Sequence, residues 1–205
     1  MPITKPAPRE GRGCSDLVFA PLLKDETGAI EYGEVEALAW CKSITEGQEQ
    51  TTEKTWADNA PVLNKYSGIA FTRTFSCLLP EEKVKARLEG QYIETDSTLT
   101  GVSSTAKPLE CACGYKVYDT DGTVFYRWLF KGTFTFGQEV YVTMDDGTES
   151  NGIEITFNAL QTVHKFTKTN SSETGIKIAE NDTKYDTSTF FDQVTHFDNL
   201  TEKSV

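Results

Sequence analysis

The sequence predicts a mainly β protein: an antiparallel β-sandwich or barrel with one flanking α-helix, a long protruding hairpin and a short C-terminal helix. Aromatic residues make up 11% of the 205 residues, and aromatic side chains favour strands. Several segments alternate apolar and polar residues with the two-residue period of a half-buried strand. Turn-forming Asp-Gly and Asn-Gly pairs separate these segments, as in an antiparallel meander.

The length and the composition predict one large domain with extensions. A chain of 205 residues can bury roughly 70% of its unfolded surface and needs no covalent staples. Three prolines and two glycines before residue 14 predict a flexible N-terminal arm over residues 1–14. We expect the β domain over residues 15–166. Residues 167–205 should form a polar insertion and a C-terminal helix packed on the same domain.

The first half of the domain is predicted to form strands and a hairpin. Apolar runs predict strands over 16–23 and 33–41, joined through the turn at Asp25–Gly28. Apolar residues are sparse in 43–67, which predicts two extended arms that join near Asp58 and Asn59. The alternation in 69–77 then predicts a half-buried strand.

One helix is expected, over residues 80–91. Pro80 suits a first helical turn, and Glu81 and Glu82 complement the positive end of the helix dipole. Val84, Leu88 and Tyr92 fall at i, i+4 and i+8, so we expect them to form an apolar stripe against the sheet.

The second half predicts four more strands and a terminal helix. The strands are expected at 109–118, 124–130, 139–144 and 153–159, and the second of these should be buried on both faces. Ile176 and Ile178 lie in a polar stretch that is either a loop or a short edge strand. Phe190, Val194 and Phe197 have helical spacing, which predicts a C-terminal helix docked on the body.

Charge and cysteine content narrow the functional classes. The net charge of −11 and the pI near 4.7 argue against an electrostatic grip on nucleic acid. The N-terminus lacks the apolar core of a signal peptide, so we expect the chain to stay in the cytoplasm where it is made. Five cysteines, an odd number, then fit reduced buried thiols rather than a disulfide framework. Only Cys111 and Cys113 are close in sequence, and no second pair completes a zinc site.

No catalytic, metal-binding or cofactor-binding residue is predicted. His164, in an expected strand, and His196, in the expected terminal helix, have no companion at metal-ligand spacing. The chain has no Gly-x-Ser-x-Gly elbow, no glycine-rich phosphate loop and no dinucleotide fingerprint. Arg73 and Arg127 interrupt apolar strands, and we interpret them as structural partners of a carboxylate or as stems laid across aromatic rings.

Several segments together resemble a known family. They are DLVFAPL at 16–22, KDETG at 24–28, WADNAP at 56–61, LPEE at 79–82 and YRWLFKGTF at 126–134. In this order they resemble the major tail tube proteins of long, non-contractile-tailed bacteriophages. The similarity covers roughly residues 14–166 and a terminal helix. The proline-rich arm, the Ser/Thr-rich loop near 96–105 and the insertion after Lys165 depart from the family pattern.

The resemblance implies a structural role in the virion tail, assembled in the host bacterial cytoplasm. Six subunits would form a ring, and stacked rings would form a hollow tube with an acidic channel through which viral DNA passes without adhering. The tape measure, distal tail and terminator proteins of the tail are the other implied partners. The implied subunit interface is the hairpin arm, with the residues Thr52, Glu53, Thr55, Trp56, Asp58, Asn59 and Pro61.

The position of Trp56 also predicts, independently of the resemblance, that the hairpin binds another chain. Trp56 lies in a polar run at the predicted hairpin tip, where it has no local core to enter. Burying an aromatic side chain removes about 150–250 Å² from water, so we expect this ring to bind another chain. Two alternatives remain. A monomeric recognition module could bind carbohydrate or protein through Trp40, Trp56 or Trp128, and an enzyme could have an unrecognised site that uses His164 or His196.

Overall fold

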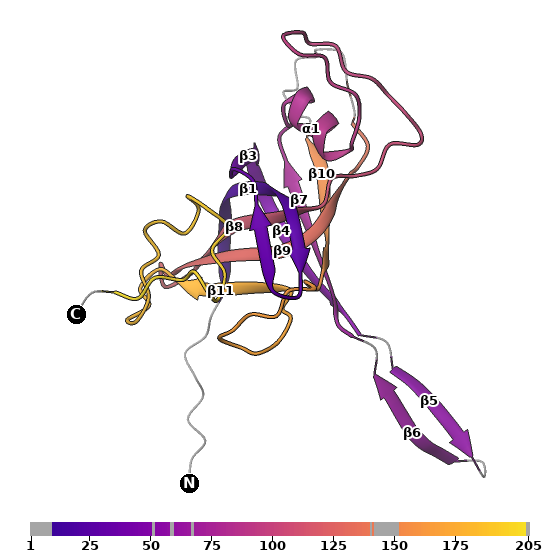
Figure 1. The fold of residues 1–205 in the computed structure, drawn as a ribbon, viewed down its shortest axis with the longest axis vertical. Helices are drawn as coiled ribbons and strands as arrows, with labels where there is room; N and C mark the ends of the chain where they lie inside the picture. The colour runs from indigo at the N-terminus through magenta and orange to yellow at the C-terminus, as the bar shows by residue number, and fades with distance from the viewer. Residues whose placement is uncertain are drawn as a thin grey trace.

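The computed structural model describes residues 10–50, 52–57, 60–66, 68–139, 141 and 152–203. It is mainly β, with a nine-stranded antiparallel sheet and, in the described residues, one helix (Figure 1). The first strands are β1 (Gly11–Glu26), β2 (Ala29–Tyr32), β3 (Glu36–Ala39), β4 (Cys41–Glu49), β5 (Thr52–Ala57) and β6 (Ala60–Tyr66). They are followed by β7 (Ala70–Cys77), α1 (Glu82–Leu88), β8 (Cys111–Asp119), β9 (Val124–Phe136), β10 (Ile153–Leu160) and β11 (Gly175–Ala179).

The main sheet curls until β1, with β3 beside it, meets the end strand β4. Its strand order is β2-β1-β8-β9-β10-β7-β4, with β11 added beside β9 and β3 beside β1. Only Trp40 separates β3, which pairs with β1, from β4, which pairs with β7. Strands β1 and β4 also contact each other. The predicted mainly β fold is therefore confirmed, and the sheet has the closed character of a barrel.

Two apolar clusters lie on the two faces of the sheet. The first includes Leu17, Phe19, Leu38, Phe75, Leu88, Tyr115, Leu129, Phe134, Ile155 and Phe157. The second includes Ala20, Tyr126, Trp128, Phe130, Phe166, Ile178, Phe190 and Val194. Strand β9 supplies both clusters, which confirms that this strand is buried on both faces. Its alternation directs Trp128 into one cluster and Leu129 into the other.

Helix α1 lies at the end of the sheet opposite the projecting hairpin (Figure 1). It is shorter than the predicted 80–91, but it buries Leu88 fully and Val84 partly against the first cluster. Tyr92 does not continue the stripe and is 62% exposed, because the chain leaves the helix at Gly90. Gly90 has a φ of 70°, and a Cβ added there would lie 1.9 Å from the carbonyl oxygen of Lys107. Only glycine fits this position.

The predicted C-terminal helix is wrong. Residues 187–200 form successive turns, although Phe190 and Val194 are buried as expected. Asn199 explains part of the difference, because its side chain accepts a hydrogen bond from the His196 N–H and donates one to the Val194 carbonyl. Such local side-chain bonds offer the backbone an alternative to the helical ladder.

Other boundaries also differ from the sequence prediction. Strand β1 already begins at Gly11, which pairs with Asp119 of β8, so the expected arm is shorter than 1–14. Residues 1–9 lie outside the described part. Of the strand expected at 33–41, only β3 forms, Cys41 begins β4, and β2 lies before the expected range. The edge-strand alternative for Ile176 and Ile178 is confirmed by β11. Of the strand expected at 139–144, only Glu139 and Tyr141 are described, and neither is in a strand.

Candidate functional site

The hairpin β5–β6 projects away from the main sheet (Figure 1). It continues the antiparallel pair β4–β7, whose last partners are Glu49 and Ala70. The pairing resumes at Thr52 with Tyr66 and runs to Ala57 with Ala60. The predicted long hairpin is therefore present. Its projecting part covers 52–66 rather than 43–67, because β4 belongs to the main sheet.

The structure places the backbone of five predicted interface residues in this hairpin. Thr52, Glu53 and Thr55 pair with β6, and Trp56 pairs with Pro61 beside an irregularity in the register. The side chains of these residues, and the whole of Asp58 and Asn59 at the predicted tip, lie outside the described part of the chain. Their expected role in an interface stays a prediction.

The projecting hairpin pairs with no strand of the main sheet in the residues that the structure describes. The strands β5 and β6 form a separate two-stranded sheet. An isolated two-stranded hairpin is at best marginally stable in water, and three or more strands or a packing partner are normally needed. A packing surface would add to the stability of this two-stranded element.

A second exposed feature is the apolar corner at Trp40. Trp40 is 81% exposed where the chain turns from β3 into β4, and its carbonyl accepts a hydrogen bond from the Leu78 N–H. Leu78 and Leu79 are also exposed. Trp40 and Leu79 line a cleft of about 830 Å³, together with Leu17, Val18, Leu38, Val84 and Phe191. Exposed apolar patches of this kind mark interaction surfaces.

The three tryptophans therefore differ as candidates for a binding platform. Trp128 is fully buried and donates its indole N–H to the Phe190 carbonyl at 3.0 Å. It cannot contact a ligand, so this part of the recognition-module alternative is wrong. Trp40 is available on the surface, and the side chain of Trp56 is not described.

Arg73 and Arg127 form a polar cluster at the sheet face. Arg73 is 8% exposed and donates to the Tyr115 hydroxyl at 2.9 Å and to the carbonyl oxygen of Gly47. The Tyr115 hydroxyl donates to Glu46, which also pairs with Arg127. Burial alone would raise the pKa of Glu46, but the charge of Arg127 and the bonds from Tyr115 and Arg127 hold it below its usual value. The predicted structural reading of both arginines agrees with these contacts.

An open cleft of about 640 Å³ adjoins this cluster. Its basic side chains are Arg12, Lys42, Arg127 and Lys177, and its acidic ones are Glu10, Glu46 and Asp119. Because the two signs are nearly balanced, the cleft shows no preference for an anionic or a cationic ligand.

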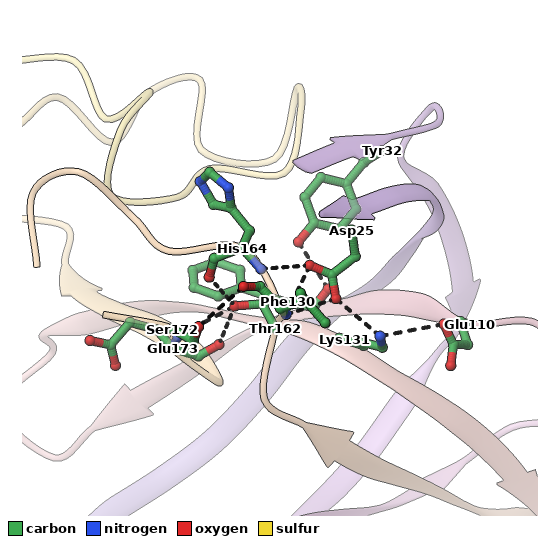
Figure 2. Close-up of polar contacts among 10 residues, drawn as sticks. Asp25, Tyr32, Glu110, Phe130, Lys131, Thr162, His164, Ser172 and Glu173 are labelled. Atoms are coloured by element: carbon green, nitrogen blue, oxygen red, sulfur yellow. Dashed lines mark hydrogen bonds and ion pairs between the residues drawn. The ribbon is translucent and has the colours of Figure 1, made fainter. Parts of the chain in front are cut away.

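Asp25 organises the polar contacts in Figure 2. Its carboxylate accepts hydrogen bonds from the N–H groups of Val163 and His164 at 2.9 Å, and Lys131 lies at 3.0 Å. Lys131 also faces Glu110 at 3.7 Å. These bonds fasten the loop after β10 to β1 and β9. The arrangement orders the backbone at Val163 and His164.

The two histidines both lie beside Phe166. His164 lies in a bend and not in the expected strand, with its Nε2 3.6 Å from Asp198. Its Nδ1 is buried without a hydrogen-bond partner in the described residues. His196 accepts a long backbone bond from the Asp198 N–H, and burial lowers its pKa. Both rings pack against Phe166.

The cysteines are free thiols, as predicted, but only three are buried. Burial raises the pKa of Cys111 to about 12 and that of Cys113 well above its usual value, so both stay protonated. Cys14 and Cys41 are half-buried instead. Within the ranges that the structure describes, no cluster of His, Cys, Asp and Glu could hold a metal ion.

Comparison with known proteins adds no assignment. None of the described segments forms a helix long and apolar enough to span a bilayer. No protein-family model matches the sequence, and no curated protein matches it significantly.

Proposed function

We propose that this protein is the structural subunit of a bacteriophage tail tube, in which hexameric rings stack around a channel for viral DNA. The observation that carries the proposal is the hairpin β5–β6, which leaves the body as a separate two-stranded sheet (Figure 1). A lone hairpin of this kind needs a packing surface. A neighbouring subunit that presents the same fold supplies one at every position of a ring.

Head-to-tail contact between identical subunits has two outcomes, a closed ring or an open filament. A tail tube uses both, because rings close around the axis and continue along it. The exposed corner at Trp40, Leu78 and Leu79 adds a second apolar surface that a monomer would leave in water. A protein with a projecting arm and a separate apolar patch has the two surfaces that such an assembly requires.

The charge also favours this function. The chain has a net charge of −11. A surface of that sign repels the phosphate backbone, so DNA can move past it without binding. DNA is then cargo in passage, and the lasting partners are further copies of the subunit and the tape measure, distal tail and terminator proteins of the tail.

Deletion of residues 51–67 tests the proposal directly. The last pair of β4–β7 is Glu49 with Ala70, so the deletion leaves Gln50, Gly68 and Ile69 as a three-residue loop. Loops of that length close antiparallel hairpins readily. We expect the shortened chain to fold, with the circular dichroism of its parent, and to remain monomeric.

The parent protein should sediment as rings at high concentration and show tubes in negative-stain electron microscopy. If the parent stays monomeric at every concentration, or if the shortened chain still forms rings, the proposal is wrong. Oligosaccharide binding by a monomeric parent, lost on Trp40→Ala, would instead support the recognition-module alternative.

A further inference from the structure

Two thiols from distant parts of the chain touch where the sheet closes. Cys14 Sγ and Cys41 Sγ are 3.0 Å apart, although the residues are 27 positions apart in the sequence. Cys14 belongs to β1, and Cys41 is the first residue of β4, directly after the corner at Trp40. The pairing of β1 with β3 brings the two strands together.

The pair is open to solvent from two sides. Both cysteines are half-buried, whereas Cys77, Cys111 and Cys113 are buried. Cys14 lines the mixed-charge cleft and also the apolar cleft, and Cys41 lines the apolar cleft. A small reagent can therefore reach this pair, while the other three thiols are shielded.

We propose that Cys14 and Cys41 form an oxidisable dithiol site, which a small-molecule disulfide such as oxidised glutathione converts to an intramolecular disulfide. The thiolate of one cysteine attacks the glutathione disulfide, forms a mixed disulfide and releases one glutathione thiolate. The second cysteine then attacks the protein sulfur of the mixed disulfide and releases the other glutathione. The protein loses two electrons and two protons, and both are recovered in two molecules of reduced glutathione.

The geometry needs only a small adjustment. A disulfide has an S–S bond of about 2.05 Å, so the two sulfurs must approach by about 1 Å. Strand β1 is irregular next to the pair: Asp16 has a φ of 52°, and the register with β8 shifts between Ser15 and Val18. A bulge of this kind gives the strand local freedom that a regular ladder lacks.

The raised pKa values of the two thiols predict a slow reaction at neutral pH. The hydrogen bond with Cys41, burial and the nearby Cys41 charge raise the pKa of Cys14 far above its usual value. The bond with Cys14 lowers the pKa of Cys41. Contact with Cys77 and burial outweigh this effect and raise the pKa of Cys41 to about 12. Only the thiolate is nucleophilic, so oxidation is slow at neutral pH. Its rate should rise about tenfold per pH unit from pH 7 to 9, whereas that of an ordinary thiol with a pKa near 8.5 levels off.

Oxidation of the full-length protein tests the site. Trypsin cleaves after Arg12, Lys24 and Lys42, so Cys14 and Cys41 fall on separate peptides, and Cys77 falls on a third. After incubation with oxidised glutathione, we expect an intact mass lower by two hydrogen atoms, and alkylation of the denatured protein should then add three alkyl groups rather than five. The non-reduced digest should contain one crosslinked pair, with Cys14 and Cys41, and the melting temperature should rise because the crosslink constrains the unfolded chain.

Serine variants provide the controls. Cys14→Ser should abolish the crosslink and the rise in melting temperature, and Cys111→Ser, at a shielded thiol, should change neither. A crosslink between Cys41 and Cys77, a lasting glutathione adduct on Cys14, or unchanged thiols at pH 9 would each overturn the proposal. Because the main experiment uses the unmodified protein, it does not depend on whether a variant folds. Its result is also independent of ring formation.

Discussion

Lys131 Nζ lies 3.0 Å from Asp25 Oδ2, and this ion pair joins the middle of β9 to the end of β1. The carboxylate of Asp25 is 5% exposed, and it also accepts the backbone bonds of Val163 and His164. Burial alone would raise the pKa of Asp25, but these two donors and Lys131 hold it below its usual value. The folded state therefore favours the charged form of this carboxyl group.

Replacing this carboxylate should destabilise the protein in a pH-dependent way. We expect Asp25→Asn to lower the free energy of unfolding by about 3 kcal/mol at pH 7, because Lys131 loses its buried counter-charge. A lowered pKa contributes stability above the unfolded value, near 3.9, and that contribution is lost as the pH falls through the folded value. The two proteins should therefore converge in acid.

Urea unfolding at pH 7 and at pH values below about 4 measures this difference. Glu26→Gln is the matched control, because Glu26 pairs with Lys24 on the surface and its side chain is 68% exposed. That change should stay within about 0.5 kcal/mol. An equal loss for both variants at pH 7 would contradict the buried ion pair.

Trp56→Ala tests the hairpin as an interface. The change should leave the monomer folded and weaken ring formation by more than about 2 kcal/mol, the scale of an interface hot spot. Sedimentation of variant and parent at matched concentrations measures it. Tyr92→Ala is the control, because Tyr92 is 62% exposed and follows α1, which lies at the end of the sheet opposite the hairpin. Equal sedimentation of parent and Trp56→Ala would count against the interface.

Gly90→Ala should cost about 3 kcal/mol or more in the free energy of unfolding. The positive φ strains any other residue, and the new Cβ would lie 1.9 Å from the Lys107 carbonyl oxygen, so the backbone must shift. Gly28→Ala is the control, since nothing lies within 4 Å of a Cβ there. Thermal and urea unfolding of both variants compare them. A stable Gly90→Ala protein would show that the loop beside α1 adapts.

The buried Trp128 and the exposed Trp40 should differ in emission wavelength and in quenching by iodide. Trp128→Phe removes a buried indole and its bond to the Phe190 carbonyl, so we expect a loss of about 1–3 kcal/mol and of the blue-shifted emission. Trp40→Phe should instead remove emission that iodide quenches, with little effect on stability. If iodide quenches the parent and Trp40→Phe equally, Trp40 is not the exposed indole.

The alternation of apolar and polar residues predicted most of the strands. It did so because a strand that buries one face carries an apolar residue at every second position. The alternation from Tyr126 to Phe130 places side chains in both clusters, as expected. The polar stretch after Glu49 forms the predicted hairpin. The helical spacing of Phe190 and Val194 identified buried residues but not their backbone. That backbone follows bonds made by the Asn199 side chain, which residue spacing does not reveal.

Contacts that depend on sheet closure could not be predicted. Cys14 and Cys41 looked like small buried hydrophobes, and only the pairing of β1 with β3 brings their sulfurs together. The exposure of Trp40 has the same origin, because the chain changes pairing partner at that residue. The proposed interface at the hairpin depends on a second chain, which no single sequence contains.

The pairing of β1 with β8 has a consequence for how the chain matures. Glu10 and Asp119 are bonded although they are 109 positions apart, so β1 cannot complete its pairing until β8 has been synthesised. Topologies dominated by such distant contacts fold slowly, and their unpaired edges are exposed to aggregation meanwhile. Productive synthesis should therefore depend on temperature and on chaperone supply more than the final stability suggests.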